Sequence, residues 1–342
     1  MTRILTGVCA IAFLSVLSAC SGTSPFLDGT VDPNDPNEPD ADLLFERPPG
    51  TTNPSPSSSI TRFEPDYGTG VQGGDNRARD FTYDATADTF TVDNLAFDGS
   101  NVYQRGTAVA GLQTTARVYE SDAVFPDTFP TPDTPIRQFP HRLVAAETAD
   151  GSGRYAIVRT SQYVNYGFGG FIYERNGSVV LPTSGQASYS GEYNGLRDFN
   201  GKGGLEYVTG DMSLAIDFED FNDGNGVVGS VTNRRFFDLN GNDVTQDYLD
   251  DLTDALGAPQ GSVPDIQWVV GPGVMDENGE IIGSVFTQAL VGGGTIEQIG
   301  EGIYYAIISG DNAENVIGII TLEENLGDFA VRETGGFILE RP

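Results

Sequence analysis

The sequence predicts an all-β protein: a small antiparallel β domain followed by an eight-stranded antiparallel β-barrel, with one short helix inserted in the barrel. Three observations predict it. Short apolar runs separated by Gly, Asp, Asn and Pro fill residues 63–175, period-two alternation recurs from residue 183 onward, and only residues 244–256 show helical spacing. Short strands at close spacing with turn residues between them are typical of antiparallel sheets.

The clearest alternation lies in residues 212–219. There the apolar side chains alternate with polar or small ones, which predicts a strand with one buried and one solvated face. The buried set is Met212, Leu214, Ile216 and Phe218. Residues 186–193 repeat the pattern, and further runs bring the total to about nine candidate strands, close to the eight of a small barrel.

A different period marks the helix. Val244, Tyr248, Leu252 and Leu256 recur every four residues, and Gly257 follows them. This spacing predicts a short amphipathic helix that stops at a glycine. We expect it to pack outside the barrel or to cap one end.

A repeated sequence motif indicates the boundary between two β domains. Residues 169–175 read GGFIYER and residues 335–341 read GGFILER. We interpret each as the last strand of its own domain, which gives domains at 60–182 and 183–342. Two similar edge strands in one sheet are the alternative. The proline-rich residues 125–140 are predicted to form a surface loop in the first domain.

The N-terminal residues predict export. Residues 1–19 carry one charge, on Arg3, and an apolar run too short for a membrane span, as a secretory signal peptide does. Residues 17–20 read LSAC, which resembles the lipobox of bacterial lipoproteins. That resemblance implies an acylated Cys20, and Ser21 behind it favours the outer membrane. An ordinary signal peptide with an incidental cysteine is the alternative.

Composition separates the anchor from the folded part. Pro, Asp, Asn, Ser and Thr dominate residues 20–59, and such a segment cannot build a core, so it is predicted to be a disordered tether. The other cysteine, Cys9, lies within the signal peptide. The folded part is therefore expected to contain no disulfide and to owe its stability to burial.

The charge balance excludes one class of partner. Lys and Arg number 18 against 49 Asp and Glu, for a formal net charge of −31. A surface of this sign repels nucleic acid. It would attract a basic partner or divalent cations, or it serves solubility alone.

Two segments resemble a known family. Residues 184–195 (SGQASYSGEYNG) resemble the opening strand of the barrel domains of the transferrin-binding protein B family, and residues 309–319 (SGDNAENVIGI) resemble the penultimate barrel segment. The resemblance implies a handle domain of small β elements followed by an eight-stranded barrel. Transferrin-binding protein B has two such lobes, whereas this chain has room for one, and none of the family's ligand-contacting residues can be matched here.

The residues for common catalytic sites are scarce. The exported chain would have one histidine, His141, which lies in a proline-flanked segment and is interpreted as solvated. Serine or cysteine catalysis would have to use it, and the usual zinc sites are excluded. The many carboxylates permit a glycosidase-like acid pair, but a filled small barrel offers it no cleft. We therefore predict neither an enzyme nor a cofactor.

Acidic turns raise the question of calcium. Asp238, Asn240 and Asn242 stand at alternate positions, as in an EF-hand loop, but Asp243 and Leu249 occupy the places of its glycine and its glutamate. The match is incomplete, so the three residues are candidates only. Residues 217–226 form a second acidic loop.

These observations predict a monomeric, lipid-anchored outer-membrane protein that faces the periplasm or the outside. Its expected role is a surface binding module that holds a protein or a metal-carrying ligand through barrel and handle loops. A structural envelope lipoprotein without a soluble ligand is the alternative, and a hydrolase is the third hypothesis.

Overall fold

Strands dominate the computed structural model, which describes residues 47–65, 78, 80–93, 102–106, 115–127, 134–160, 165–219, 226–269 and 274–342. All of them belong to one compact unit, Asp42–Pro342. The predicted signal peptide, Cys20 and most of the predicted tether lie outside the described residues. No helix in the described part of the chain is long and apolar enough to span a membrane.

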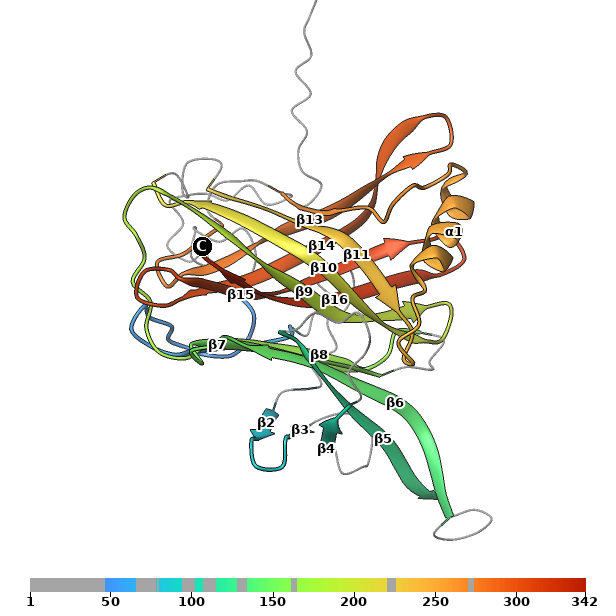
Figure 1. Ribbon diagram of the computed structural model, residues 1–342, viewed down its shortest axis with the longest axis horizontal. Coiled ribbons are helices and arrows are strands. Elements are labelled where there is room, and N and C mark those ends of the chain that lie inside the picture. The colour runs from blue at the N-terminus through green and yellow to red at the C-terminus, as the bar shows by residue number, and fades with distance from the viewer. Residues whose placement is uncertain are drawn as a thin grey trace, which may run out of the picture. The chain divides into compact units, whose positions relative to one another are not determined.

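The first eight described strands form one antiparallel sheet (Figure 1). They are β1 (Ile60–Phe63), β2 (Asp80–Asp84), β3 (Thr89–Asp93), β4 (Val102–Arg105), β5 (Arg117–Asp127), β6 (Thr134–Glu147), β7 (Gly153–Thr160) and β8 (Gly169–Arg175). Their order across the sheet is β1-β8-β7-β6-β5-β4-β3-β2. Every neighbouring pair except β1 and β8 is also consecutive in sequence, as in a meander.

The remaining described strands form a closed antiparallel barrel of eight. They are β9 (Gln186–Asn200), β10 (Leu205–Asp217), β11 (Val227–Phe237), β12 (Ile266–Trp268), β13 (Glu280–Val291), β14 (Thr295–Ser309), β15 (Asn315–Asn325) and β16 (Ala330–Glu340). The barrel closes where β16 pairs with β9. The predicted all-β class, with a small sheet before an eight-stranded barrel, is confirmed.

Side chains fill the barrel. In β10, Met212 and Leu214 are buried whereas Ser213 between them is exposed, as the alternating pattern predicted. Further along the interior, the Trp268 and Tyr304 rings stack with their centroids 3.6 Å apart. These residues belong to one apolar cluster, so this interior is a core.

The single described helix, α1 (Thr245–Leu256), lies at one end of the barrel (Figure 1). Its Tyr248 and Leu252 are buried in the barrel's own core cluster, which satisfies the apolar face that the four-residue spacing predicted. The helix ends at Gly257, whose left-handed φ of 64° is accessible to glycine at little cost. The predicted helix is confirmed, and it caps one end of the barrel.

One face of the first sheet packs on the outside of the barrel. Phe171 in β8 lies 5.9 Å from Tyr305 in β14, centroid to centroid, within a second apolar cluster. Nearby, the Tyr155 ring lies against Gly336, where an added Cβ would come within 2.2 Å of a ring carbon. Strands β14 and β15 are thus buried on both faces along much of their length, which explains their nearly continuous apolar sequences.

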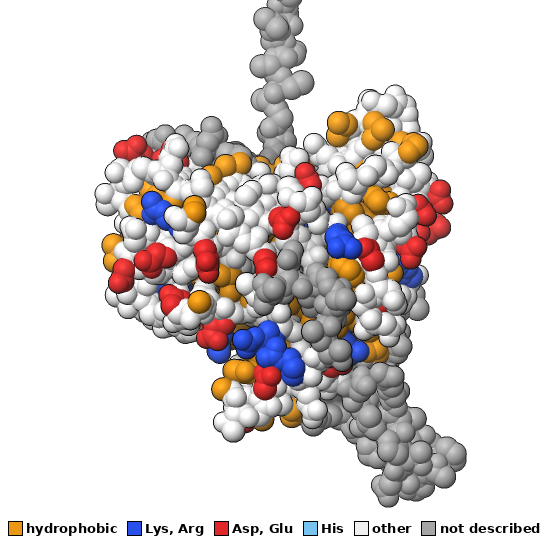
Figure 2. All heavy atoms as spheres, in the orientation of Figure 1, with side chains coloured by type: hydrophobic (Ala, Val, Ile, Leu, Met, Phe, Trp, Pro, Cys, Tyr) orange, Lys and Arg blue, Asp and Glu red, His pale blue; other side chains and the backbone are white. Residues whose placement is uncertain are grey.

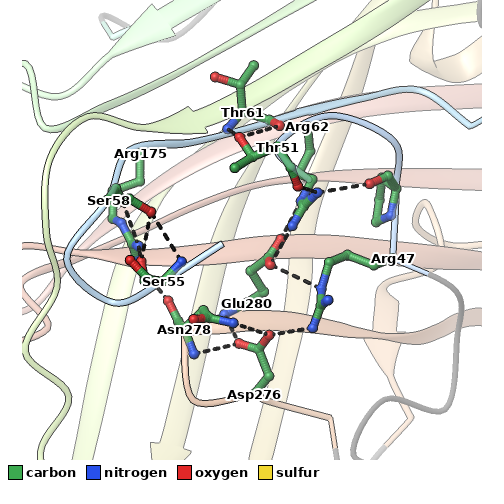
Figure 3. A network of polar contacts seen from close by, with 11 residues as sticks. Arg47, Thr51, Ser55, Ser58, Thr61, Arg62, Arg175, Asp276, Asn278 and Glu280 are labelled. Atoms are coloured by element: carbon green, nitrogen blue, oxygen red, sulfur yellow. Dashed lines mark hydrogen bonds and ion pairs between the residues drawn. The ribbon is translucent and has the colours of Figure 1, made fainter. Parts of the chain in front are cut away.

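Buried ion pairs also connect the first sheet to the barrel (Figure 3). Arg62 in β1 donates two hydrogen bonds to Glu280 in β13, at 2.5 and 2.7 Å. Arg47 donates one of 2.7 Å to Asp276 and lies 3.1 Å from Glu280. The sheet and the barrel therefore share a polar network as well as an apolar interface.

Part of the predicted tether belongs to this network. Arg175 donates to the carbonyl oxygens of Ser55 and Ser58, both at 3.0 Å, and to that of Asn278 at 2.7 Å. Residues 47–59 are thus hydrogen-bonded to the folded part, whereas composition predicted a disordered tether over the whole of 20–59. A polar segment can be held by its backbone carbonyls alone, which hydropathy does not reveal.

The loop predicted for residues 125–140 is wrong where the structure describes it. Residues 125–127 end β5 and residues 134–140 begin β6, with Phe125 opposite Ile136 and Pro126 opposite Pro135. The end of β5 and the beginning of β6 thus form a two-stranded extension of the sheet. It reaches past β7, because β6 pairs with β7 only from His141 onward. A proline is tolerated there because a strand with a free edge needs fewer ladder hydrogen bonds.

Candidate functional site

The first sheet curls, and the curl encloses a pocket. Phe81 in the edge strand β2 and Ile172 in β8 line the same cavity, although five strands separate β2 from β8 in the sheet order. The cavity has a volume of about 290 Å³. It lies on the face of the sheet away from the barrel, where a third apolar cluster packs.

The strand register explains why a hollow forms. On this face Arg117 in β5 stands opposite Ala145 in β6, Ala145 opposite Ala156 in β7, and Ala156 opposite Ile172. The next row inward carries Tyr119, Leu143 and Val158 in the same order. Two adjacent methyl groups thus form the floor beside a row of bulky side chains, and the difference in volume leaves the cavity.

Aromatic rings form the wall above this floor. The Phe90 ring lies 4.9 Å from Tyr83 and 4.8 Å from Tyr119, the second contact being edge-to-face. Phe90 and Tyr119 are buried, and Tyr83 is partly exposed. Such offset and edge contacts are favourable for aromatic pairs and present ring faces to an incoming group.

One carboxylate fixes the wall. Asp88 accepts hydrogen bonds of 2.9 Å from the hydroxyls of Tyr83 and Tyr119, and two more from Arg105 at 2.9 and 3.1 Å. The hydrogen bond from Arg105 is the main reason that the pKa of Asp88 falls to about 2, and both tyrosines lower it further. Asp88 has a φ of 52°, a conformation that Asp adopts more readily than most residues.

Charged side chains stand at the mouth. Glu147 in β6 faces Arg154 in β7, and Arg154 faces Glu174 in β8, with which it forms an ion pair of 2.5 Å. Arg117 is exposed at the end of the alanine row. The pocket thus combines an apolar floor, an aromatic wall and a polar entrance, which is the composition of small-molecule sites.

On the face shown in Figure 2, acidic side chains are scattered over the barrel, whereas basic side chains gather over the sheet below it. The separation is of interest because the whole chain has 18 basic against 49 acidic residues. On this face, the basic side chains therefore lie nearer the sheet than the acidic side chains of the barrel do.

The predicted calcium residues do come together, as a turn. The Asp238 carboxylate accepts hydrogen bonds of 2.8 Å from the backbone N–H groups of Asn240 and Asn242, and the Asn242 side-chain amide donates another. Burial raises the pKa of Asp238, but these hydrogen bonds outweigh it and hold the pKa below its ordinary value. No cluster of three or more metal-ligating side chains occurs among the described residues.

The other site residues considered in the sequence are Cys20, the second acidic loop and His141. Cys20 lies outside the described residues, as do residues 220–225 of the second acidic loop. The interpretation of His141 as a solvated loop residue is wrong: it belongs to β6, is buried, and its Nδ1 lies 3.2 Å from the Tyr103 hydroxyl. The pocket itself was missed, because two alanines in separate strands signal nothing until the register sets them side by side.

Comparisons with known proteins return similar folds only. No family model matches the chain, and no curated protein matches it.

Among solved structures, the chain is similar to transferrin-binding protein B from Haemophilus parasuis Hp5, a double mutant, at 10% identity over 75% of this chain and a TM-score of 0.36. It is similar to intact Ap-TbpB, with N and C lobes, at 10% identity over 75% of this chain and a TM-score of 0.32. It spans only 40% and 42% of those two chains. A putative outer membrane protein from Bacteroides fragilis NCTC 9343 gives 10% identity over 83% of this chain and 89% of that chain, with a TM-score of 0.21.

Proposed function

We propose that this protein is a lipid-anchored binding module of the outer membrane whose ligand site is the pocket of the curled sheet. The observation that carries the proposal is the floor of Ala145 and Ala156 beneath the ring of Phe90. A sheet that served only as a spacer would gain stability by filling this hollow with larger side chains. The binding role predicted from the sequence is kept, with recognition placed in a pocket in addition to loops.

Filling the pocket tests the proposal. Ala156→Leu adds volume to the floor, and the matched control Thr82→Leu adds it to an exposed position of β2. Saturation-transfer NMR with indole and phenylacetamide as probes should show binding to the wild type and to Thr82→Leu, and loss of binding in Ala156→Leu. Absence of binding to the wild type would favour the alternative, a structural envelope lipoprotein.

The membrane anchor is a separate part of the proposal. Lipid on Cys20 would hold the protein at the membrane through its acyl chains, each contributing about 0.8 kcal/mol per buried CH₂. Cys20→Ala should then abolish the incorporation of labelled fatty acid and release the protein from the membrane fraction. A Cys20→Ala variant that still sediments with membranes and still incorporates label would contradict the anchor.

A further inference from the structure

The chain carries few cations, and nearly all of those whose side chains the structure describes are engaged. Its 18 basic residues comprise 17 arginines and one lysine, Lys202. Buried arginines such as Arg62, Arg159 and Arg234 each pair with a carboxylate. The exposed Arg235 also does so, with Asp243 at 2.5 Å. In a chain with such an excess of carboxylates, an arginine finds a partner readily.

Arg117 is the exception. Among the arginines whose side chains the structure describes, it is the one that has no hydrogen bond, ion pair or ring contact. It also lines the pocket, at the end of the row that continues through Ala145 and Ala156. Among the described arginines, the one without a partner is therefore the one beside the apolar hollow.

Two other charged side chains at the pocket mouth, Arg154 and Glu147, do not compete with Arg117 for an anion. Arg154, on the other side of the mouth, is engaged by Glu174. Glu147 lines the pocket as well, is exposed, and carries no described ion pair, so it opposes an anion. Arg117 is thus the group at the mouth that can receive an acid group without breaking an existing pair.

We propose that the pocket binds a small anionic ligand with an aromatic or branched apolar body, whose carboxylate is held by Arg117. The apolar body lies between the alanine floor and the ring of Phe90. The guanidinium donates hydrogen bonds to both carboxylate oxygens, a geometry that arginine provides better than lysine. The cavity of about 290 Å³ admits a small molecule and not a folded segment. This inference rests on the proposed function, because it names the ligand class of the same pocket.

Three probes with the same phenyl body separate charge from shape: phenylacetate, its isosteric amide phenylacetamide, and the cationic phenethylamine. Titration calorimetry at low salt should show that the wild type binds phenylacetate about twofold to fivefold more tightly than phenylacetamide, as expected for one exposed charge pair. Phenethylamine should bind most weakly. Arg117→Gln should abolish the preference for phenylacetate while leaving the affinity for phenylacetamide unchanged.

Glu147→Gln is the matched variant of opposite sign, and it should increase the affinity for phenylacetate by about twofold to threefold. Equal binding of phenylacetate and phenylacetamide, or a preference for phenethylamine, would overturn the inference and leave the proposed function standing. Failure of every probe to bind the wild type would overturn both. A preference for phenylacetate that persists in Arg117→Gln would show that another group holds the acid.

Discussion

The side chains of Arg62 and Glu280 form a two-point ion pair across the interface between the first sheet and the barrel, with Nε–Oε1 and Nη2–Oε2 distances of 2.5 and 2.7 Å. Arg62 is 2% exposed and Glu280 is fully buried. The two residues are 218 positions apart in sequence. The pair ties the first sheet to the barrel, because Arg62 without Glu280 would be a buried charge that has lost its ion-pair partner.

Removing one member of this pair should therefore be costly. Glu280→Gln keeps the shape but leaves Arg62 without a counter-charge, and we expect a loss of about 3 to 5 kcal/mol in the free energy of unfolding in urea. The control is Asp243→Asn, which breaks the exposed pair with Arg235 and should cost no more than about 1 kcal/mol. Equal losses would show that the Arg62 pair is solvated.

The interface also predicts how the barrel behaves alone. A fragment beginning at Pro182 should close its barrel, because β9 and β16 pair within it. It should also self-associate, because Tyr305, Ile317 and their apolar neighbours on the outer face lose their cover. Circular dichroism should show β-structure, and sedimentation should show oligomers. A monomeric fragment as stable as the intact chain would contradict this account of the interface.

The two residues that directly follow strand β10 offer a test of the barrel register. Phe218 is 3% exposed within the barrel core, so Phe218→Ala should leave a cavity and cost about 3 to 5 kcal/mol. Glu219 is exposed, and Glu219→Ala should change the free energy of unfolding by no more than about 0.5 kcal/mol. Denaturant melts of the two variants provide the comparison, and similar losses would refute the assigned register.

The aromatic wall of the pocket should respond to acid through Asp88. Its pKa is lowered from 3.8 to about 2 in the fold. The stabilisation it provides is therefore complete above pH 3.8 and is lost as the pH falls through about 2. The difference in unfolding free energy between the wild type and Asp88→Asn should shrink over this interval.

Arg105→Gln is the companion variant, because the hydrogen bond from Arg105 is the largest cause of the lowered pKa. Asp88→Asn introduced into this background should show a weaker dependence on pH than in the wild type. A stability difference that stays constant down to pH 2 in the wild-type background would mean that Asp88 is not held as the structure shows it.

Local patterns predicted the elements with one solvated face. The alternation around Leu214 and the four-residue spacing around Leu252 both depend on contrast between a wet and a dry face, and both were confirmed. Strands were predicted less well where the sequence shows no contrast between a solvated and a buried face. Residues 134–140 read as a loop because of their prolines, although β6 runs through them.

The candidate site could not be predicted, for a physical reason. A pocket is a property of neighbours in space, and its floor of Ala145 and Ala156 is set by the pairing of β6 with β7. The sequence shows only that each alanine stands in an apolar run. In the same way, the sequence around Arg62 does not indicate that it pairs with Glu280, 218 positions away.

The most direct test of the account is NMR of the full chain with isotope-labelled alanine methyl groups, titrated with phenylacetate. The methyl signals of Ala145 and Ala156 should shift in a saturable manner, while that of Ala306, buried in the barrel core, should stay unchanged. Ala145 and Ala156 signals that do not move, or shifts confined to alanines of the barrel, would contradict the claim that the curled sheet holds the ligand site.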